Sequence, residues 1–169
     1  MKKITLLLIA ALCLFALELS AQSHRFFQPV AESDIARRDG TVREFFPKKY
    51  QTYKLDYAAA KSVLQTAPWE FTAEARAQKC VMAMPLPDGT MEDFSVWQIA
   101  MLEPELAAQY PEIRTYAGQS LRTPGRTVRF SCTLRGFRAM FMQPDLGAGY
   151  VEPHTWGQDE YYIVYDRCV

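Results

Sequence analysis

The pattern of apolar and polar positions places the centre of the predicted fold between Phe94 and Gln119. The run Phe94–Leu102 has apolar residues at both odd and even positions, which is typical of a strand covered on both faces. The Glu-Pro-Glu triplet at 103–105 then predicts a short helix, because proline is tolerated at the first helical position and acidic residues suit the positive helix end. Pro111 ends that helix, and Ile113–Ala117 predicts the next strand.

Two hairpins are predicted around this centre. The apolar runs Cys80–Leu86 and Met91–Leu102 are joined by a Pro-Asp-Gly-Thr turn at 87–90. Thr127–Leu134 alternates strictly, with its even-numbered residues expected inside, and a turn at 135–136 leads into Phe137–Met142. Further strands are predicted at Arg43–Leu55, Tyr150–Glu152 and Tyr161–Tyr165. The first of these is expected at a sheet edge, because it contains a proline and two lysines.

One amphipathic helix is predicted between Asp56 and Ala67. Asp56 suits the N-cap position, and Pro68 ends the helix. Its apolar side chains recur on one face, which needs a sheet to cover. The sequence therefore predicts an α+β fold: a mainly antiparallel sheet of about seven strands, with this packed helix and the short helix after residue 103.

The amino terminus has the features of a signal peptide over Met1–Ala21. Two lysines precede an apolar core from Ile4 to Leu17, and small residues precede a cleavage site between Ala21 and Gln22. The apolar core is too short for a spanning helix, so no stable membrane anchor is expected. The chain is predicted to be exported to the periplasm, the cell surface or the medium. Residues 22–42 are expected to be a lead-in segment, 43–167 one domain, and 168–169 a stub toward a downstream domain.

Composition argues against several functions. The chain has 19 basic and 19 acidic side chains, so it lacks the basic excess that gathers phosphates, and nucleic acid is not an expected partner. Its only histidines are His24 and His154, and neither belongs to an HExxH motif or to a pair at metal-ligand spacing. No nucleophile-elbow motif or glycine-rich phosphate loop is present. We therefore predict no catalytic residue of its own and no cofactor.

Some individual residues carry separate expectations. Of Cys80, Cys132 and Cys168, one pair is expected to form a disulfide on export; Cys80 with Cys132 is a candidate, and the sequence does not choose among the pairings. Trp97 is expected in the core, whereas Trp156, in a polar loop, suits core and surface equally. The acidic pairs at 92–93 and 159–160 are expected in solvated turns.

Four segments together resemble the amino-terminal propeptide region of secreted reprolysin-like zinc metallopeptidases of Bacteroidota. They are Pro47–Pro68, Pro85–Leu121, Thr127–Phe141 and Tyr150–Arg167, and the most specific part is EPELAAQYPEIRTYAG at 103–118. The resemblance runs in order over nearly all of the chain after the signal peptide. It implies a downstream catalytic domain with an HExxH motif, none of whose zinc ligands or general base stands in this chain.

The resemblance implies a secreted propeptide-like domain that assists the folding of a zinc metallopeptidase and keeps it latent, in cis or in trans. Cys168 is then a candidate ligand to the partner's zinc, by analogy with latent animal reprolysins, and steric cover of the cleft is the other mechanism. The alternative function is a stand-alone secreted module that binds protein or glycan. A reading frame that continues past Val169 to an HExxH motif would favour the propeptide, and a stop codon would favour the module.

Overall fold

Ten β-strands form one continuous sheet in the part of the chain that the structure describes. In this computed structural model that part comprises residues 24–36, 40, 42–77, 79–144 and 147–167. The strand order is β1-β4-β5-β6-β7-β8-β9-β10-β3-β2, and all neighbouring strands are antiparallel except β1 and β4. The strands are β1 (His24–Arg25), β2 (Phe27–Pro29), β3 (Gln51–Leu55), β4 (Cys80–Pro85), β5 (Met91–Ile99), β6 (Arg114–Ser120), β7 (Thr127–Thr133), β8 (Gly136–Gln143), β9 (Gly147–Pro153) and β10 (Tyr161–Asp166).

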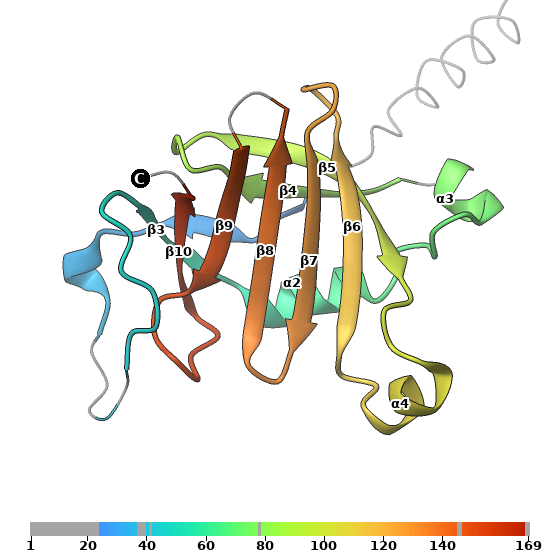
Figure 1. The fold of residues 1–169 in the computed structure, drawn as a ribbon, viewed down its shortest axis with the longest axis horizontal. Helices are drawn as coiled ribbons and strands as arrows, with labels where there is room; N and C mark the ends of the chain where they lie inside the picture. Colours follow the sequence, from blue (N-terminus) through green and yellow to red (C-terminus); the bar gives the residue numbers. More distant parts are fainter. Residues whose placement is uncertain (1–23, 37–39, 41, 78, 145–146, 168–169) are drawn as a thin grey trace, which may run out of the picture.

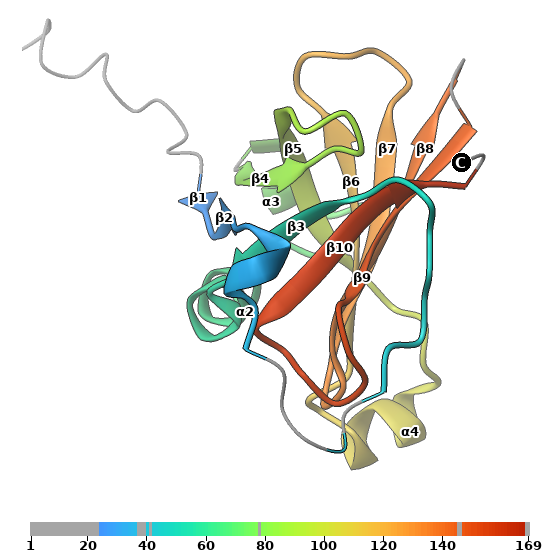
Figure 2. The ribbon, with the colours of Figure 1, turned by 90° about the vertical axis from the view of Figure 1, so that its left-hand side faces the viewer.

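The sheet curls into an almost closed barrel, and the segment that contains β1 and β2 joins its two edges (Figures 1 and 2). In β1, His24 pairs with Met82 of β4. In β2, Phe27 pairs with Leu55 of β3, at the other edge of the sheet. The same short segment therefore covers the unpaired backbone groups of both edges, which would otherwise be free to pair with another chain.

The barrel interior is filled by the inward residues of the alternating strands. Tyr116 and Phe130 face each other from β6 and β7 with stacked rings 4.9 Å apart. The Tyr162 hydroxyl accepts a hydrogen bond from the Phe137 backbone N–H at 3.1 Å, which satisfies the one polar atom of that buried ring. Gly136 has a φ of 95°, and a Cβ there would lie 2.9 Å from the Tyr162 hydroxyl, so only glycine fits this turn.

Helix α2 (Tyr57–Leu64) lies across one end of the barrel. The Asp56 carboxylate caps it by accepting a hydrogen bond from the Ala59 N–H, as the sequence predicts. Leu64 is fully buried in the core, and the Tyr57 hydroxyl donates a hydrogen bond to the Thr133 carbonyl at 2.8 Å. The buried face of α2 thus covers the apolar interior at the end of β7.

A charged cluster is buried where β5, β6, β7 and β8 meet the loop between β6 and β7. The Glu92 carboxylate, at the start of β5, is hydrogen-bonded by Ser120 and Arg126, and Arg122 lies 3.2 Å away. Arg126 also donates to the Gln143 side chain at 2.8 Å. Although burial opposes ionisation of Glu92, the hydrogen bonds from Ser120 and the nearby guanidinium groups hold its pKa below the ordinary value.

The predicted fold class is wrong in the number and pairing of its elements. The described part of the chain has ten strands instead of about seven, in a mixed sheet, together with three short α-helices. β1 and β2 lie in the stretch expected to be a lead-in; they are too short for periodicity to show. The helices α3 (Ala73–Ala77) and α4 (Pro104–Gln109) bury no residue, and a short 3-10 helix η1 spans Glu32–Asp34.

Several local expectations are corrected as well. Strand β3 is confined to Gln51–Leu55 and lies between β10 and β2, so it is not an edge; its predicted first half runs outside the sheet. Glu92 is buried at 2% exposure and not in a solvated turn, because its partners come from distant loops. Leu134, which alternation places inside, is 80% exposed in the turn that ends β7.

Trp97 is only half-buried and points out of the barrel, because the inward positions of β5 are its even-numbered residues. Both hairpins are confirmed.

Candidate functional site

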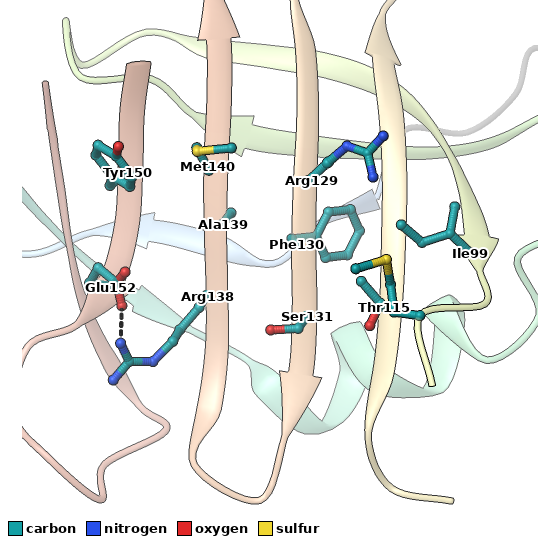
Figure 3. Close-up of a pocket in the computed structure, with 11 residues that line it drawn as sticks. Ile99, Thr115, Arg129, Phe130, Ser131, Arg138, Ala139, Met140, Tyr150 and Glu152 are labelled. Atoms are coloured by element: carbon teal, nitrogen blue, oxygen red, sulfur yellow. Dashed lines mark ion pairs between the residues drawn. The ribbon is translucent and has the colours of Figure 1, made fainter. Parts of the chain in front are cut away.

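The outer face of the barrel carries an open groove of about 280 Å³ across β5 to β9 (Figure 3). Its walls are the outward positions of strands whose other face forms the core, since successive residues of a strand point to opposite sides. Figure 3 shows Tyr150 on β9 at one side of the groove and Ile99 and Thr115 at the other, with Met140 on β8 and Ser131 on β7 between them.

The apolar wall of the groove continues beyond it. Ile99 and Thr115 also line a second hollow of about 60 Å³, which extends the surface toward Trp69 and helix α4. Met101, shared by both hollows, is 64% exposed. Leu106, on α4, is 43% exposed. We call the groove, the second hollow and α4 together the methionine-rich surface, after Met101 and Met140, which both line the groove.

The other end of the groove is charged. The Arg138 guanidinium lies 2.8 Å from the carboxylate of Glu152 on β9 and 2.9 Å from that of Glu44. Burial raises the pKa of Glu152 to about 7; the attraction of Arg138 opposes this shift, and the negative charge of Glu44 adds to it. Because Arg138 is shared between two acids, its attraction does not offset the cost of burying the Glu152 charge.

Residues 42–50, which we call the strap, position this charged end. Phe45 packs against Tyr165 at 6.4 Å, and the Arg138 guanidinium lies over the Phe45 ring at 5.6 Å. The Val42 carbonyl accepts a hydrogen bond from the Trp156 N–H at 2.8 Å. The strap thus crosses from the loop between β9 and β10 to the outer face of β8 and β9, and holds Arg138 beside Glu152.

The two histidines make contacts that join segments of the fold. His154 is buried, and its Nε2 lies 3.0 Å from the Glu32 carboxylate, which is in turn 3.2 Å from Arg43 of the strap. These contacts tie η1 and the strap to the barrel. His24 lies in β1, where its ring stacks on Phe26. Among the described residues no group of three His, Cys, Asp or Glu side chains is placed to hold a metal ion.

Cys80 and Cys132 are free thiols and do not form the disulfide considered from the sequence. They lie on β4 and β7, with β5 and β6 between them in the sheet, so three strand spacings of about 4.8 Å separate them along it. A disulfide needs Cα atoms within about 7 Å. Burial raises the pKa of Cys132 to about 12, which makes its thiol unreactive. Cys168, Ala21 and Gln22 lie outside the described residues.

Sequence reasoning missed every residue that lines the groove. The sequence signal that could have identified the groove is the set of outward-facing residues on β7 and β8, where Arg129 pairs with Met140. Alternation predicts only that Arg129 faces outward. Trp156 is 46% exposed, with Arg135 over its ring at 4.7 Å, so it belongs to the surface. Asp159 is exposed in its loop, as expected for a solvated turn.

No helix within the described ranges has the length and apolar content needed to cross a bilayer. Comparison of the chain with protein-family models, with curated proteins and with solved structures finds no match.

Proposed function

We propose that this chain is a secreted propeptide-like domain that assists the folding of a zinc metallopeptidase and keeps it latent, and that it has no catalytic activity of its own. The identity of the partner comes from the sequence resemblance to the propeptide region of reprolysin-like peptidases. The observation that carries the proposal is the methionine-rich surface, because an exposed apolar surface of this kind marks an interaction site.

The placement of the most specific segment of the resemblance supports this proposal. Residues 103–118 form α4, its following turn and β6. The helix buries none of its residues, and Leu106 and Tyr110 are exposed. Its apolar side chains therefore contribute little to this domain's own stability, and contact with a second domain gives them a role.

Latency by steric cover needs a rigid body held over a cleft, and the barrel has the features of one. Its edges are closed by β1 and β2, and its interior is filled with aromatic side chains. A preorganised surface also loses little conformational freedom on binding, which favours affinity. Folding assistance follows from the same contacts, because a ligand that binds only the folded peptidase stabilises that state.

The test is to add the purified chain in trans to the catalytic domain of the reprolysin-like peptidase from the same genome. Cleavage of a fluorogenic peptide should fall in proportion to the added chain, and the yield of active peptidase on refolding should rise. A zinc peptidase of an unrelated fold serves as the control and should be unaffected. Absence of both effects would reject the proposal and favour the stand-alone binding module.

Export is part of this proposal and has its own test. Cleavage after Ala21 leaves Gln22 as the first residue, two residues before β1. Intact-mass measurement of the secreted product should give a chain that begins at Gln22, and a product that retains Met1 would contradict export by signal cleavage.

A further inference from the structure

The groove contains one charged side chain that has no partner among the described residues. Its charged lining residues are Arg129, Arg138 and Glu152. Arg138 and Glu152 pair with each other, and Arg138 also holds Glu44. Arg129, on β7, is exposed and makes no ion pair or hydrogen bond within the described chain. The groove therefore presents one guanidinium, that of Arg129, that is available to an anion.

Arg129 lies directly beside the apolar wall. It pairs in register with Met140 of β8, so the guanidinium stem and the thioether emerge from neighbouring strands on the same face. Ile99 lines the groove from β5 (Figure 3), and Met101, two residues further along the chain, also belongs to its lining. Thioether side chains adapt to the shape of a bound group. An occupant that matches this site places a negative charge next to a large apolar group.

We infer that the groove binds a peptidase segment in which a carboxylate residue adjoins a large apolar residue, with the carboxylate on Arg129 and the apolar side chain between Met101 and Met140. This inference rests on the proposed function and names the chemistry of its partner. The groove volume of about 280 Å³ lies just below the range of small-molecule pockets and suits one or two side chains.

Two features of the groove favour a polypeptide over a small amphiphile such as a fatty acid. It is an open surface hollow that continues into the second hollow and α4, so it can follow a chain beyond one residue. It also lies in the middle of the sheet. β5 to β9 are each paired on both edges, so the partner cannot add a strand and must be recognised through side chains.

The first experiment measures the binding of short fluorescent peptides to the intact chain by anisotropy. One peptide contains Asp-Leu, and its matched analogues contain Asn-Leu, Lys-Leu and Asp-Ser. The Asp-Leu peptide should bind about tenfold more tightly than each analogue, the size of effect that one charge-assisted contact gives. Arg129→Gln should reduce Asp-Leu binding to the Asn-Leu level. Arg135→Gln, on an exposed turn away from the groove, should leave it unchanged.

Equal binding of the Asp-Leu and Asn-Leu peptides, or full binding by Arg129→Gln, would overturn the inference. So would a preference for phosphatidylglycerol vesicles over every peptide, because the anion would then be a lipid. Circular dichroism of each variant confirms that it is folded.

The second experiment separates this inference from the proposed function. Arg129→Gln should inhibit the peptidase about tenfold less well than the wild-type chain. If both inhibit equally, the peptidase proposal stands and the groove assignment fails. If the wild-type chain binds the Asp-Leu peptide selectively but leaves the peptidase unaffected, the groove assignment stands and the proposed function fails.

Discussion

Arg138 and Glu152 lie 2.8 Å apart on the outer face of the barrel, and the pKa of Glu152 is nevertheless raised to about 7. Attraction to one guanidinium does not compensate for the burial of the carboxylate between β8, β10 and the strap, because the same guanidinium also serves Glu44. The Glu152 carboxyl group is therefore about half protonated near pH 7. That has a measurable consequence for stability.

Glu152 should make the domain less stable as the pH rises. Its ordinary pKa of 4.5 applies to the unfolded chain, and the value of about 7 to the folded one. Between these values the folded state holds a proton that the unfolded state has released, so this contribution is present at low pH and is lost as the pH rises through 7.

The measurement is the free energy of unfolding in urea between about pH 5 and pH 8. In the wild-type chain the free energy of unfolding should fall with rising pH, with a slope that corresponds to the release of up to one proton. Glu152→Gln should abolish this contribution to the slope. Glu105→Gln, on the exposed face of α4, is the control and should keep the wild-type slope. Identical slopes for all three proteins would show that Glu152 titrates normally.

Phe27 should be essential for closing the barrel. It is 5% exposed, and its ring contacts Tyr53, Phe137 and Tyr162 edge-on. Phe27→Ala should cost about 3–5 kcal/mol in the free energy of unfolding, because it removes an aromatic ring from a filled core. Gln28→Ala, its exposed neighbour, should change stability by less than about 0.5 kcal/mol. Equal effects of the two changes would mean that β2 is not part of the core.

Leu64 tests whether α2 covers the barrel interior. It is fully buried in the core cluster, so Leu64→Ala should cost about 2–5 kcal/mol measured by urea unfolding. Ser62→Ala on the exposed side of the same helix controls for helix propensity. A loss below about 0.5 kcal/mol for Leu64→Ala would show that the helix does not contribute to the core.

The hairpins could be predicted from the sequence but the closure of the barrel could not, because hairpins pair residues close in the chain and closure pairs residues far apart. Alternation and a turn motif specify the pairing of β4 with β5 within a few residues. The pairing of His24 with Met82 joins a two-residue strand to a distant one in parallel, and no local pattern marks it. Glu92 is a similar case, because its burial depends on Arg126, 34 residues away.

The groove could not be predicted from the sequence for a related reason. Alternation assigns Arg129 to the outer face, which is correct, but its proximity to Met140 follows from the register of β7 with β8. The strap adds Glu44 from outside the sheet, in a stretch predicted to be strand. Which outward side chains meet is therefore a property of the assembled sheet and not of any one segment.

Glu92 should stabilise the barrel end opposite α2. Replacing it by glutamine leaves Arg126 beside a neutral group in a site where the Glu92 side chain is fully buried. The loss should be about 3–5 kcal/mol at pH 7. Because its folded pKa is lowered, the contribution is present above the ordinary value of 4.5 and is lost as the pH falls below it, so the stabilities of Glu92→Gln and wild type should converge in acid. A constant difference across this range would contradict an ionic role.

The mechanism of latency can be decided at Cys168, which lies outside the described residues. The methionine-rich surface supports steric cover, whereas a thiolate in the cleft would displace the water that hydrolysis needs. We expect steric cover, so Cys168→Ser should inhibit the peptidase within about twofold of the wild-type chain. If the thiolate ligates the zinc, inhibition should weaken tenfold or more, because serine is a poor zinc ligand at neutral pH. Arg129→Gln, which alters the groove and keeps the cysteine, should show the opposite pattern: weaker inhibition under steric cover through the groove, and little change if the thiolate provides most of the affinity.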